Sequence, residues 1–200
     1  GAGTGAADLI TVRGMRLLGQ ADVIIYAGSL VNPELLQYAK ADCEIHNSAK
    51  LTLDEVIDIM QKAEVQNKRI VRLHTGDPSI YGAVREQMDE LDKLGIAYES
   101  CPGVSACFGA AASLNLEYTL PEVSQSLIIT RMEGKTKVPS KESIESFAAH
   151  QCASIAHMSR VFYMGRTYLP CMPVNWFTIY MERRYYNRYS RRCSYKPSKK

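Results

Sequence analysis

The segment His74–Gly82 combines residue types that can bind a polar ligand, since a carboxylate, two glycines and a proline stand close together in it. Gly76 and Gly82 permit backbone conformations that other residues avoid, and Pro78 stiffens the turn between them. Asp77 offers a carboxylate that can either cap the following helix or accept hydrogen bonds from a ligand. These two roles of Asp77 remain equally open at this point.

Two further glycine-containing turns occupy comparable places. The segment Cys101–Cys107 contains a Pro-Gly turn and Ser105, which can cap a helix or donate to a ligand. Gly1–Gly5 precedes a predicted helix, but its spacing is not that of dinucleotide-binding loops, and a tight structural turn explains it equally well. Because the carboxyl ends of parallel strands meet at one edge of a sheet, we expect the turns that follow successive strands to line one ligand-binding crevice.

The sequence does not show the residue patterns that other kinds of catalysis require. The four histidines lie in different predicted elements and suggest neither a metal cluster nor a proton relay; they are His46, His74, His150 and His157. Ser29, Ser105 and Ser124 lack the turn context of a hydrolase nucleophile, and Cys107 is better interpreted as a small apolar helix residue than as an activated thiol. The six cysteines show no zinc-ligand spacing, and we expect free thiols.

Short apolar runs alternate with amphipathic stretches over the first 115 residues. A capping box at Thr52 and Glu55 opens one predicted helix, and Gly95 ends another that covers residues 81–94. The predicted strands cover residues 22–26, 43–46, 69–74 and 96–100, and a strand at 126–131 opens a second unit before a loop at 134–140. This alternation predicts the α/β class, with a parallel-rich sheet covered by helices on both faces.

The composition is that of a globular protein, because 46% of the 200 residues are hydrophobic and 22% are charged. No apolar run reaches the roughly 18 residues of a membrane span, and the first residues do not resemble a signal peptide. Since neither Met nor a predicted strand precedes the glycine-rich start, we expect the natural protein to begin further upstream.

Charge is distributed unevenly along the chain. The formal charge is −6 over residues 1–150 and +9 over residues 151–200. From residue 151 onward Tyr and Arg become dense, and no helix or strand period is sustained. A basic tail that binds a polyanion and a reading-frame error both explain this change, and the sudden shift in composition favours the error.

Taken in order, these segments resemble the tetrapyrrole (corrin/porphyrin) methylase family. The glycine-rich start with Asp8–Gly14 matches the first motif of the family, Thr75–Gly82 the second and Pro102–Ala106 the third. Tyr26–Val31, His74 and Leu120–Arg131 narrow the resemblance to the precorrin-4 C11-methyltransferase branch. The resemblance extends from residue 1 to about residue 151, and Thr4 stands where many relatives have Pro.

The resemblance implies a site for S-adenosylmethionine and a site for a tetrapyrrole. Residues of two loops and one strand would hold the cofactor, namely Gly76, Asp77, Ile80, Tyr81, Ser105, Ala106 and Met164. The first loop and the segment after the first predicted strand would hold the tetrapyrrole through Gly1, Gly3, Gly5, Ser29, Leu30 and Val31. No metal site is implied, and no catalytic residue is identified.

The resemblance also implies a two-domain tetrapyrrole methylase fold. The N-terminal α/β domain would cover residues 1–117 and the start of the C-terminal domain residues 118–165, with an unrecognised basic tail at 166–200. The C-terminal domain is therefore expected to be truncated or aberrant. The family further implies a cytoplasmic homodimer without a membrane or nucleic-acid partner.

The implied reaction moves a methyl group to ring carbon 11 of precorrin-4 or cobalt-precorrin-4. The sulfonium of S-adenosylmethionine is already activated, which agrees with the missing catalytic constellation. Arg13, Arg16 and Arg131 are candidates to bind the carboxylates of the tetrapyrrole. The alternatives are a family methylase with another substrate and an inactive, truncated or frame-altered member that only binds the cofactor.

Overall fold

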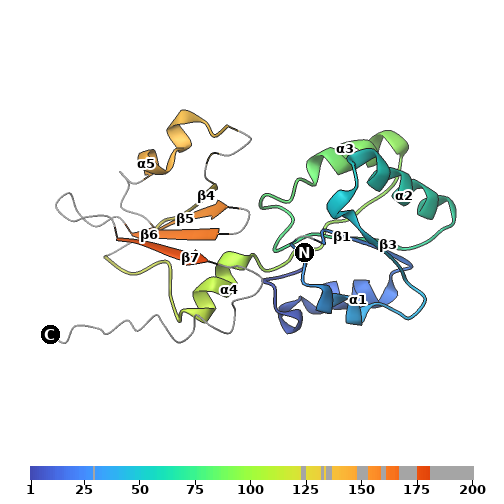
Figure 1. Cartoon of the computed structure of the whole chain (residues 1–200), viewed down its shortest axis with the longest axis horizontal. Coiled ribbons are helices and arrows are strands. Elements are labelled where there is room, and N and C mark those ends of the chain that lie inside the picture. Colours follow the sequence, from blue (N-terminus) through green and yellow to red (C-terminus); the bar gives the residue numbers. More distant parts are fainter. Residues whose placement is uncertain are drawn as a thin grey trace. The chain divides into compact units, whose positions relative to one another are not determined.

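The computed structural model describes residues 1–28, 30–122, 125–131, 133, 137–147, 153–158, 161–166 and 175–180. The chain divides into two compact units, Gly1–Ala110 and Ala111–Lys200. The first contains η1 (Ala7–Leu9), α1 (Val12–Gln20), β1 (Val23–Tyr26), η2 (Pro33–Tyr38), β2 (Glu44–Asn47), η3 (Ser48–Lys50), α2 (Leu53–Val65), β3 (Ile70–Leu73) and α3 (Arg85–Leu94) (Figure 1). Helix α4 (Ala106–Ser113) begins in the first unit and ends in the second.

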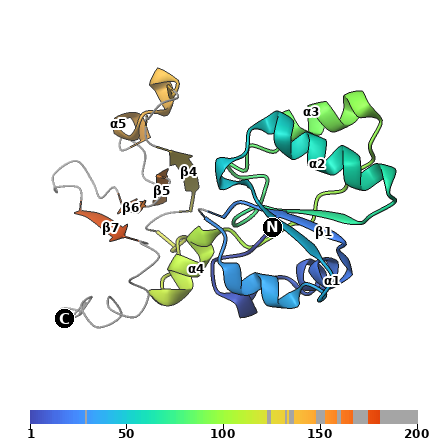
Figure 2. The same cartoon turned by 45° about the vertical axis from the view of Figure 1, so that its right-hand side comes forward.

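The first unit is built around a three-stranded parallel sheet of order β2-β1-β3. Tyr26 at the end of β1 is level with Asn47 of β2 and Leu73 of β3, so the three strands end together. Helix α1 lies on one face of this sheet, and α2 and α3 lie on the other (Figure 2). The prediction of an α/β fold with a parallel sheet and helices on both faces is confirmed.

Alternating residues of β1 divide the core into two clusters, because successive side chains of a strand point to opposite faces. Ile24 packs with Leu18 of α1 and Leu35 of η2. Val23 and Ile25 pack on the opposite face, together with Val56, Ile57, Met60 and Ala63 of α2 and Leu91 of α3. All three apolar residues of β1 named here are fully buried, which anchors the strand whose end borders the candidate site.

The helix boundaries that the sequence marks most strongly are present. Thr52 accepts a hydrogen bond from the Glu55 backbone N–H, and the Glu55 side chain accepts one in return from the Thr52 N–H, which forms the predicted capping box. Gly95 ends α3 with φ +68°, in the left-handed region that glycine adopts without strain.

The start of α3 was predicted wrongly. The apolar spacing predicts a helix from residue 81, but α3 begins at Arg85. Tyr81 and Ala83 have φ of 55° and 48°, and a left-handed residue cannot continue a right-handed helix. The segment before α3 is therefore an irregular loop that belongs to the site region.

The strand predicted at residues 96–100 is also absent. Ile96 packs on the α2 and α3 cluster, whereas Tyr98 and its neighbours are exposed, and in this described segment no residue joins a strand ladder. Local β propensity cannot form a strand without a neighbouring strand to supply hydrogen bonds.

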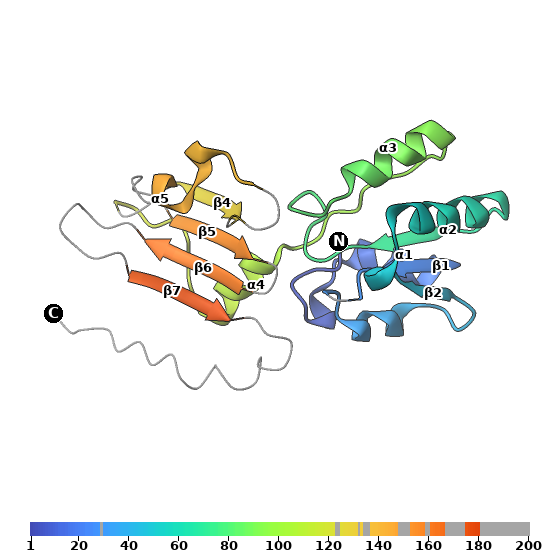
Figure 3. The same ribbon diagram turned by 45° about the horizontal axis from the view of Figure 1, so that its top comes forward.

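The second unit contains a four-stranded mixed sheet of order β4-β5-β6-β7 (Figure 3). Its elements are β4 (Leu127–Arg131), η4 (Ser140–Glu142), α5 (Ile144–Phe147), β5 (Ala153–Met158), β6 (Val161–Arg166) and β7 (Asn175–Tyr180). Strand β5 is parallel to β4 and antiparallel to β6, and β6 is antiparallel to β7. The predicted strand at 126–131 is confirmed. Strands β5, β6 and β7 form after residue 151, where the sequence sustains no helix or strand period.

Among the described residues, no helix is both long enough and apolar enough to cross a bilayer. Of the described cysteines, Cys43, Cys101 and Cys107 form no disulfide bond.

Candidate functional site

Three loops come together in the first unit, beyond the carboxyl end of β3. The Ala2 N–H donates to the His74 carbonyl over 2.6 Å, and Gly3 and Gly76 form an antiparallel bridge through N–O distances of 3.3 and 3.1 Å. The Gly1 nitrogen lies 2.8 Å from the Cys101 carbonyl oxygen. These bonds join Gly1–Gly5, His74–Gly82 and Cys101–Ser105. The two turns predicted to line one crevice, His74–Gly82 and Cys101–Cys107, thus lie close together, and Gly1–Gly5 lies beside both.

The Asp77 carboxylate is the side chain that ties two of these loops to each other. One of its oxygens accepts the Gly103 N–H at 2.9 Å, and the other accepts the Ser79 N–H at 2.8 Å and the Ser79 hydroxyl. Burial pushes the pKa of Asp77 upward, but the hydrogen bonds from Ser79 and Gly103 outweigh it and hold this pKa below its ordinary value. Asp77 is therefore ionised at neutral pH and fixes the loops relative to each other.

Glycine is required where the loops touch. A Cβ on Gly103 would lie 2.2 Å from the Gly76 carbonyl oxygen and 2.7 Å from the Gly1 Cα, far inside contact distance. Gly76 has φ +56°, and a Cβ there would rest 3.4 Å from the Ser105 Cα. By contrast, a Cβ on Gly5 would meet no atom within 4 Å, so the end of the first loop borders open space. Together the glycines form a cradle in which backbone groups can approach a ligand closely.

The segment after β1 is attached to the first loop by Asn32, a residue that the sequence analysis did not single out. Its side-chain amide donates to the Gly5 carbonyl at 2.8 Å, while its side-chain oxygen accepts the Glu34 N–H and caps η2. The capping role could be expected from sequence, because Asn directly before Pro33 is a helix-cap signal. The bond to Gly5 could not, because it joins residues that are 27 positions apart.

This attachment brings some of the predicted tetrapyrrole residues together. Leu30 is 51% exposed, whereas Val31 is 1% exposed and belongs to the core that contains Leu18 and Ile24. The Val31 side chain is therefore a packing residue, and a ligand would reach this position through its backbone. Ser29 lies outside the described residues.

The other predicted cofactor residues are distributed over loop, helix and sheet. Ile80 and Tyr81 project from the irregular loop, and Tyr81 is 48% exposed with a left-handed backbone. Ser105 is buried beside Gly76, and Ala106 is the first residue of α4. Met164 lies in β6 of the second unit, where the side chains are outside the described part of the structure.

The arginines predicted to bind carboxylates lie on two different elements. Arg13 and Arg16 lie exposed on α1, and Arg131 of β4 donates a guanidinium N–H to the Lys137 carbonyl at 2.8 Å. Among the described residues, no group of His, Cys, Asp and Glu side chains could hold a metal ion.

His74 is the buried titratable side chain at the foot of the second loop. It is 9% exposed, and its pKa is lowered from 6.5 to about 4 by burial first, and then by the charge of Arg72. The imidazole is therefore neutral at physiological pH. The sequence analysis named His74 only as part of a family signature.

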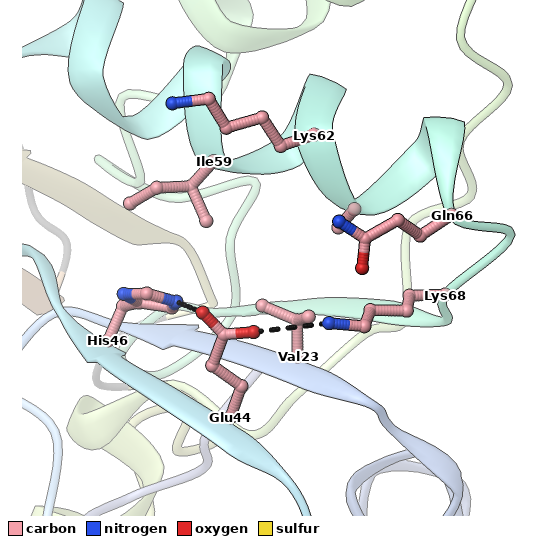
Figure 4. Close-up of a pocket in the computed structure, with 8 residues that line it drawn as sticks. Val23, Glu44, His46, Ile59, Lys62, Gln66 and Lys68 are labelled. Carbon is pink, nitrogen blue, oxygen red and sulfur yellow. Dashed lines mark hydrogen bonds and ion pairs between the residues drawn. The ribbon is translucent and has the colours of Figure 1, made fainter.

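A hollow of about 300 Å³ lies elsewhere in the first unit, between α2 and the β1–β2 part of the sheet (Figure 4). Its floor is apolar, and its rim carries Glu44, which pairs with His46 at 2.8 Å and Lys68 at 3.3 Å. Hydrogen bonds from His46 and then Lys68 lower the pKa of Glu44. None of the predicted site residues lines this hollow, and its cations are matched by nearby carboxylates, so the glycine-loop cradle is the stronger candidate site.

Comparison with known proteins identifies the family. The model of the tetrapyrrole (corrin/porphyrin) methylases matches residues 1–170. The chain belongs to this family. A methylase relative from Methanocaldococcus jannaschii, named cobalt-precorrin-4 C(11)-methyltransferase, is 60% identical over 151 residues, which are 76% of this chain and 58% of the relative.

Solved methylase structures share the fold. The X-ray structure of a cobalamin biosynthetic enzyme, cobalt precorrin-4 methyltransferase, superposes with a TM-score of 0.78 and 35% identity, over 90% of this chain and 83% of that one. A uroporphyrin-III C-methyl transferase from Thermus thermophilus, complexed with S-adenosylhomocysteine, reaches a TM-score of 0.62 at 19% identity, over 90% of this chain and 81% of that one. This methylase chain spans about three fifths of the length of the curated relatives it matches.

Proposed function

We propose that this chain is part of an S-adenosylmethionine-dependent methyltransferase that acts at carbon 11 of precorrin-4 or cobalt-precorrin-4 in cobalamin biosynthesis. The observation that carries the proposal is the cradle of three family loops, which the Asp77–Gly103 bond and the Gly3–Gly76 bridge hold together. The 60% identity to a cobalt-precorrin-4 C(11)-methyltransferase supports the choice of reaction within the family.

The loops offer surface that suits the cofactor. Gly5 borders open space, and Ile80 and Tyr81 offer partly exposed apolar surface. We infer that Gly76, Asp77, Ile80, Tyr81, Ser105 and Ala106 hold S-adenosylmethionine, with Met164 from the second unit. The bound cofactor supplies an activated methyl group, which a carbon nucleophile can accept without help from a protein nucleophile.

The protein contributes position rather than a reactive side chain. The Asp77 bonds and the Gly3–Gly76 bridge hold the loops in one arrangement before the ligand arrives. Such preorganisation lowers the barrier by several kcal/mol when it aligns the reacting atoms.

The tetrapyrrole is placed, in this proposal, against Gly1, Gly3 and Gly5 and against the segment 29–31. The bond from Asn32 to Gly5 supports this, because it holds that segment beside the first loop and leaves Leu30 exposed. We further propose that the whole protein is a cytoplasmic homodimer, as the family resemblance implies. The N-terminal domain at 1–117, the second domain from 118 to 165 and the tail at 166–200 remain proposals of the same kind.

The direct test is methyl transfer by the purified chain. Precorrin-4 and cobalt-precorrin-4 are each incubated with methyl-labelled S-adenosylmethionine, and the product is analysed by mass spectrometry and carbon NMR. One added methyl group at carbon 11 is the expected result. A methyl group at another carbon would replace the proposed reaction with a different one, and cofactor binding without transfer would reduce the chain to a binding protein.

A further inference from the structure

Gly5, at the end of the first loop, lies beyond the contacts that fix the rest of the loop. Gly3 is fixed by its bridge to Gly76. Thr4 packs closely on the first turn of α4, where a Cβ on Gly109 would lie 2.6 Å from the Thr4 Cβ. Gly5 itself is exposed, with φ +119°, and a Cβ on it would meet no atom within 4 Å. Because glycine has the widest choice of backbone conformations, packing does not hold Gly5 in place, and a hydrogen bond must.

Asn32 supplies this hydrogen bond from the segment after β1. Its side-chain NH₂ group donates to the Gly5 carbonyl at 2.8 Å and to the Glu34 carboxylate at 3.3 Å. Its side-chain oxygen accepts the Glu34 N–H at 3.0 Å, so the amide is fixed with its donor toward Gly5. The neighbouring Val31 is 1% exposed and belongs with Leu35 to one core cluster, which anchors the backbone at Asn32. The Asn32 side chain is therefore a rigid connection between the core and the loop.

The two segments joined in this way are those proposed to hold the tetrapyrrole. Gly5 lies at the end of one, and residues 30–31 directly precede Asn32 in the other. A second bond joins the same parts further along, because the Tyr38 hydroxyl of η2 donates to the Ala7 carbonyl at 3.4 Å. Asn32 is the connection that acts on Gly5 itself, so it sets the distance between the two halves of the proposed site.

We propose that Asn32 is a positioning residue for the tetrapyrrole, which acts through Gly5 rather than by contact with the substrate. The inference rests on the proposed function, which places the tetrapyrrole against these two segments. With Asn32 in place the loop is ordered before the substrate arrives, whereas without it binding must also order Gly5, which costs affinity. The loops proposed for the cofactor are held by the Asp77–Gly103 bond, so cofactor affinity should not depend on Asn32.

Two substitutions separate this role from the helix cap. Asn32→Asp and Asn32→Ser each keep an oxygen that can accept the Glu34 N–H, and both residue types are good helix caps. Neither can donate to the Gly5 carbonyl, because the carboxylate has no proton and the serine side chain is too short. We expect Kd for uroporphyrin, a carboxylate-rich tetrapyrrole, to rise roughly three- to tenfold in both variants, the size of one hydrogen bond. Kd for S-adenosylhomocysteine, measured by the same calorimetric titration, should stay at the wild-type value.

Control variants separate the positioning role from the effects of capping and charge. Asn32→Ala removes both the cap and the connection to Gly5, and it should lower the midpoint of urea denaturation as well as the tetrapyrrole affinity. Gln66→Glu is the matched control for charge, because it makes the same amide-to-carboxylate change on an exposed residue at the end of α2, and it should leave both affinities unchanged. Wild-type uroporphyrin affinity in folded Asn32→Ser would overturn the positioning role, and so would a weakening of S-adenosylhomocysteine by the same factor.

A second measurement needs no ligand. Backbone amide NMR relaxation reports the mobility of the Gly5 amide, and Gly3, which its bridge holds, is the internal reference. The connection predicts that the Gly5 amide becomes more mobile in Asn32→Ser while Gly3 keeps its wild-type mobility. Equal mobility of Gly5 in the two chains would overturn the positioning role. If the wild-type chain does not bind uroporphyrin, that result counts against the proposed function alone, and the mobility of Gly5 still decides the role of Asn32.

Discussion

Replacing Asp77 by Asn is the sharpest perturbation of the cradle, because it keeps the shape of the side chain and removes its charge. One Asp77 oxygen accepts the Gly103 N–H at 2.9 Å, and the other accepts two bonds from Ser79. In Asn, one of these oxygens becomes an NH₂ group, which meets an N–H instead of accepting it. In one orientation of the amide the bond from Gly103 that joins the two loops is lost, and in the other the bond from the Ser79 N–H within the second loop is lost.

The expected size of the effect comes from the bonds that are lost. A hydrogen bond to a charged acceptor contributes about 1.5–3 kcal/mol, and the facing N–H is then left without a partner. If the closed cradle binds the ligand, this energy appears in the affinity, and Kd for S-adenosylhomocysteine rises roughly ten- to a hundredfold. Calorimetric titration of the wild-type chain and the variant measures this directly.

Asp58→Asn is the matched control for Asp77→Asn. It makes the same chemical change in an exposed i,i+4 pair with Lys62, which contributes only about 0.3–0.5 kcal/mol. We expect its affinity to equal that of the wild-type chain. If folded Asp77→Asn binds S-adenosylhomocysteine within about twofold of wild type, the carboxylate does not hold the cradle in its binding form, and the reasoning is refuted.

Three further perturbations test other parts of the structure. Gly103→Ala forces a Cβ to within 2.2 Å of the Gly76 carbonyl oxygen, and we expect a loss of about 1–3 kcal/mol in unfolding free energy together with weaker ligand binding. The control Gly19→Ala in α1 should be neutral or stabilising by about 0.5–1 kcal/mol. Equal denaturation midpoints for the two variants would contradict this expectation. Thr52→Ala removes the capping box and should cost about 1 kcal/mol in urea denaturation without changing ligand affinity. The pKa of His74 is about 4 in the folded chain and near 6.5 in the unfolded chain, so acidification protonates the unfolded chain first. The free energy of unfolding should therefore fall by roughly 3 kcal/mol between pH 6.5 and pH 4. His74→Gln should flatten this part of the stability profile, and an unchanged slope in the variant would show that His74 is not buried as a neutral ring.

The sequence predicts well where local chemistry decides the structure. The capping box of α2, the glycine end of α3 and the apolar run of β1 each involve neighbours within a few residues. These elements were correctly predicted because the interactions that form them are visible in short segments. The rule that parallel strands end at one edge of a sheet explains the place of only the His74–Gly82 loop after β3, because the described segment before the Cys101 loop forms no strand.

Long-range contacts were not predictable in the same way. The bond from Asn32 to Gly5 and the bond from Asp77 to Gly103 join residues that are 27 and 26 positions apart. The left-handed conformations of Tyr81 and Ala83 delay the start of α3 and arise from the packing of the loop rather than from residue preference.

Three of the four strands of the second unit, β5, β6 and β7, did not follow from a strand period, for a related reason. Segments β5, β6 and β7 are short and have apolar residues in consecutive rather than strictly alternating positions. Such runs are ambiguous in sequence, and only the ladders with neighbouring strands identify them as β structure.

The most direct test of the central claim is backbone amide NMR of the labelled chain during titration with S-adenosylhomocysteine. The cradle predicts saturable shifts of the amides of Gly76, Asp77, Gly103, Ser105 and Ala106, and constant positions for Glu44, His46 and Lys68 around the hollow under α2. Shifts confined to the hollow, or none at all in a folded chain, would contradict the assignment of the three loops as the cofactor site.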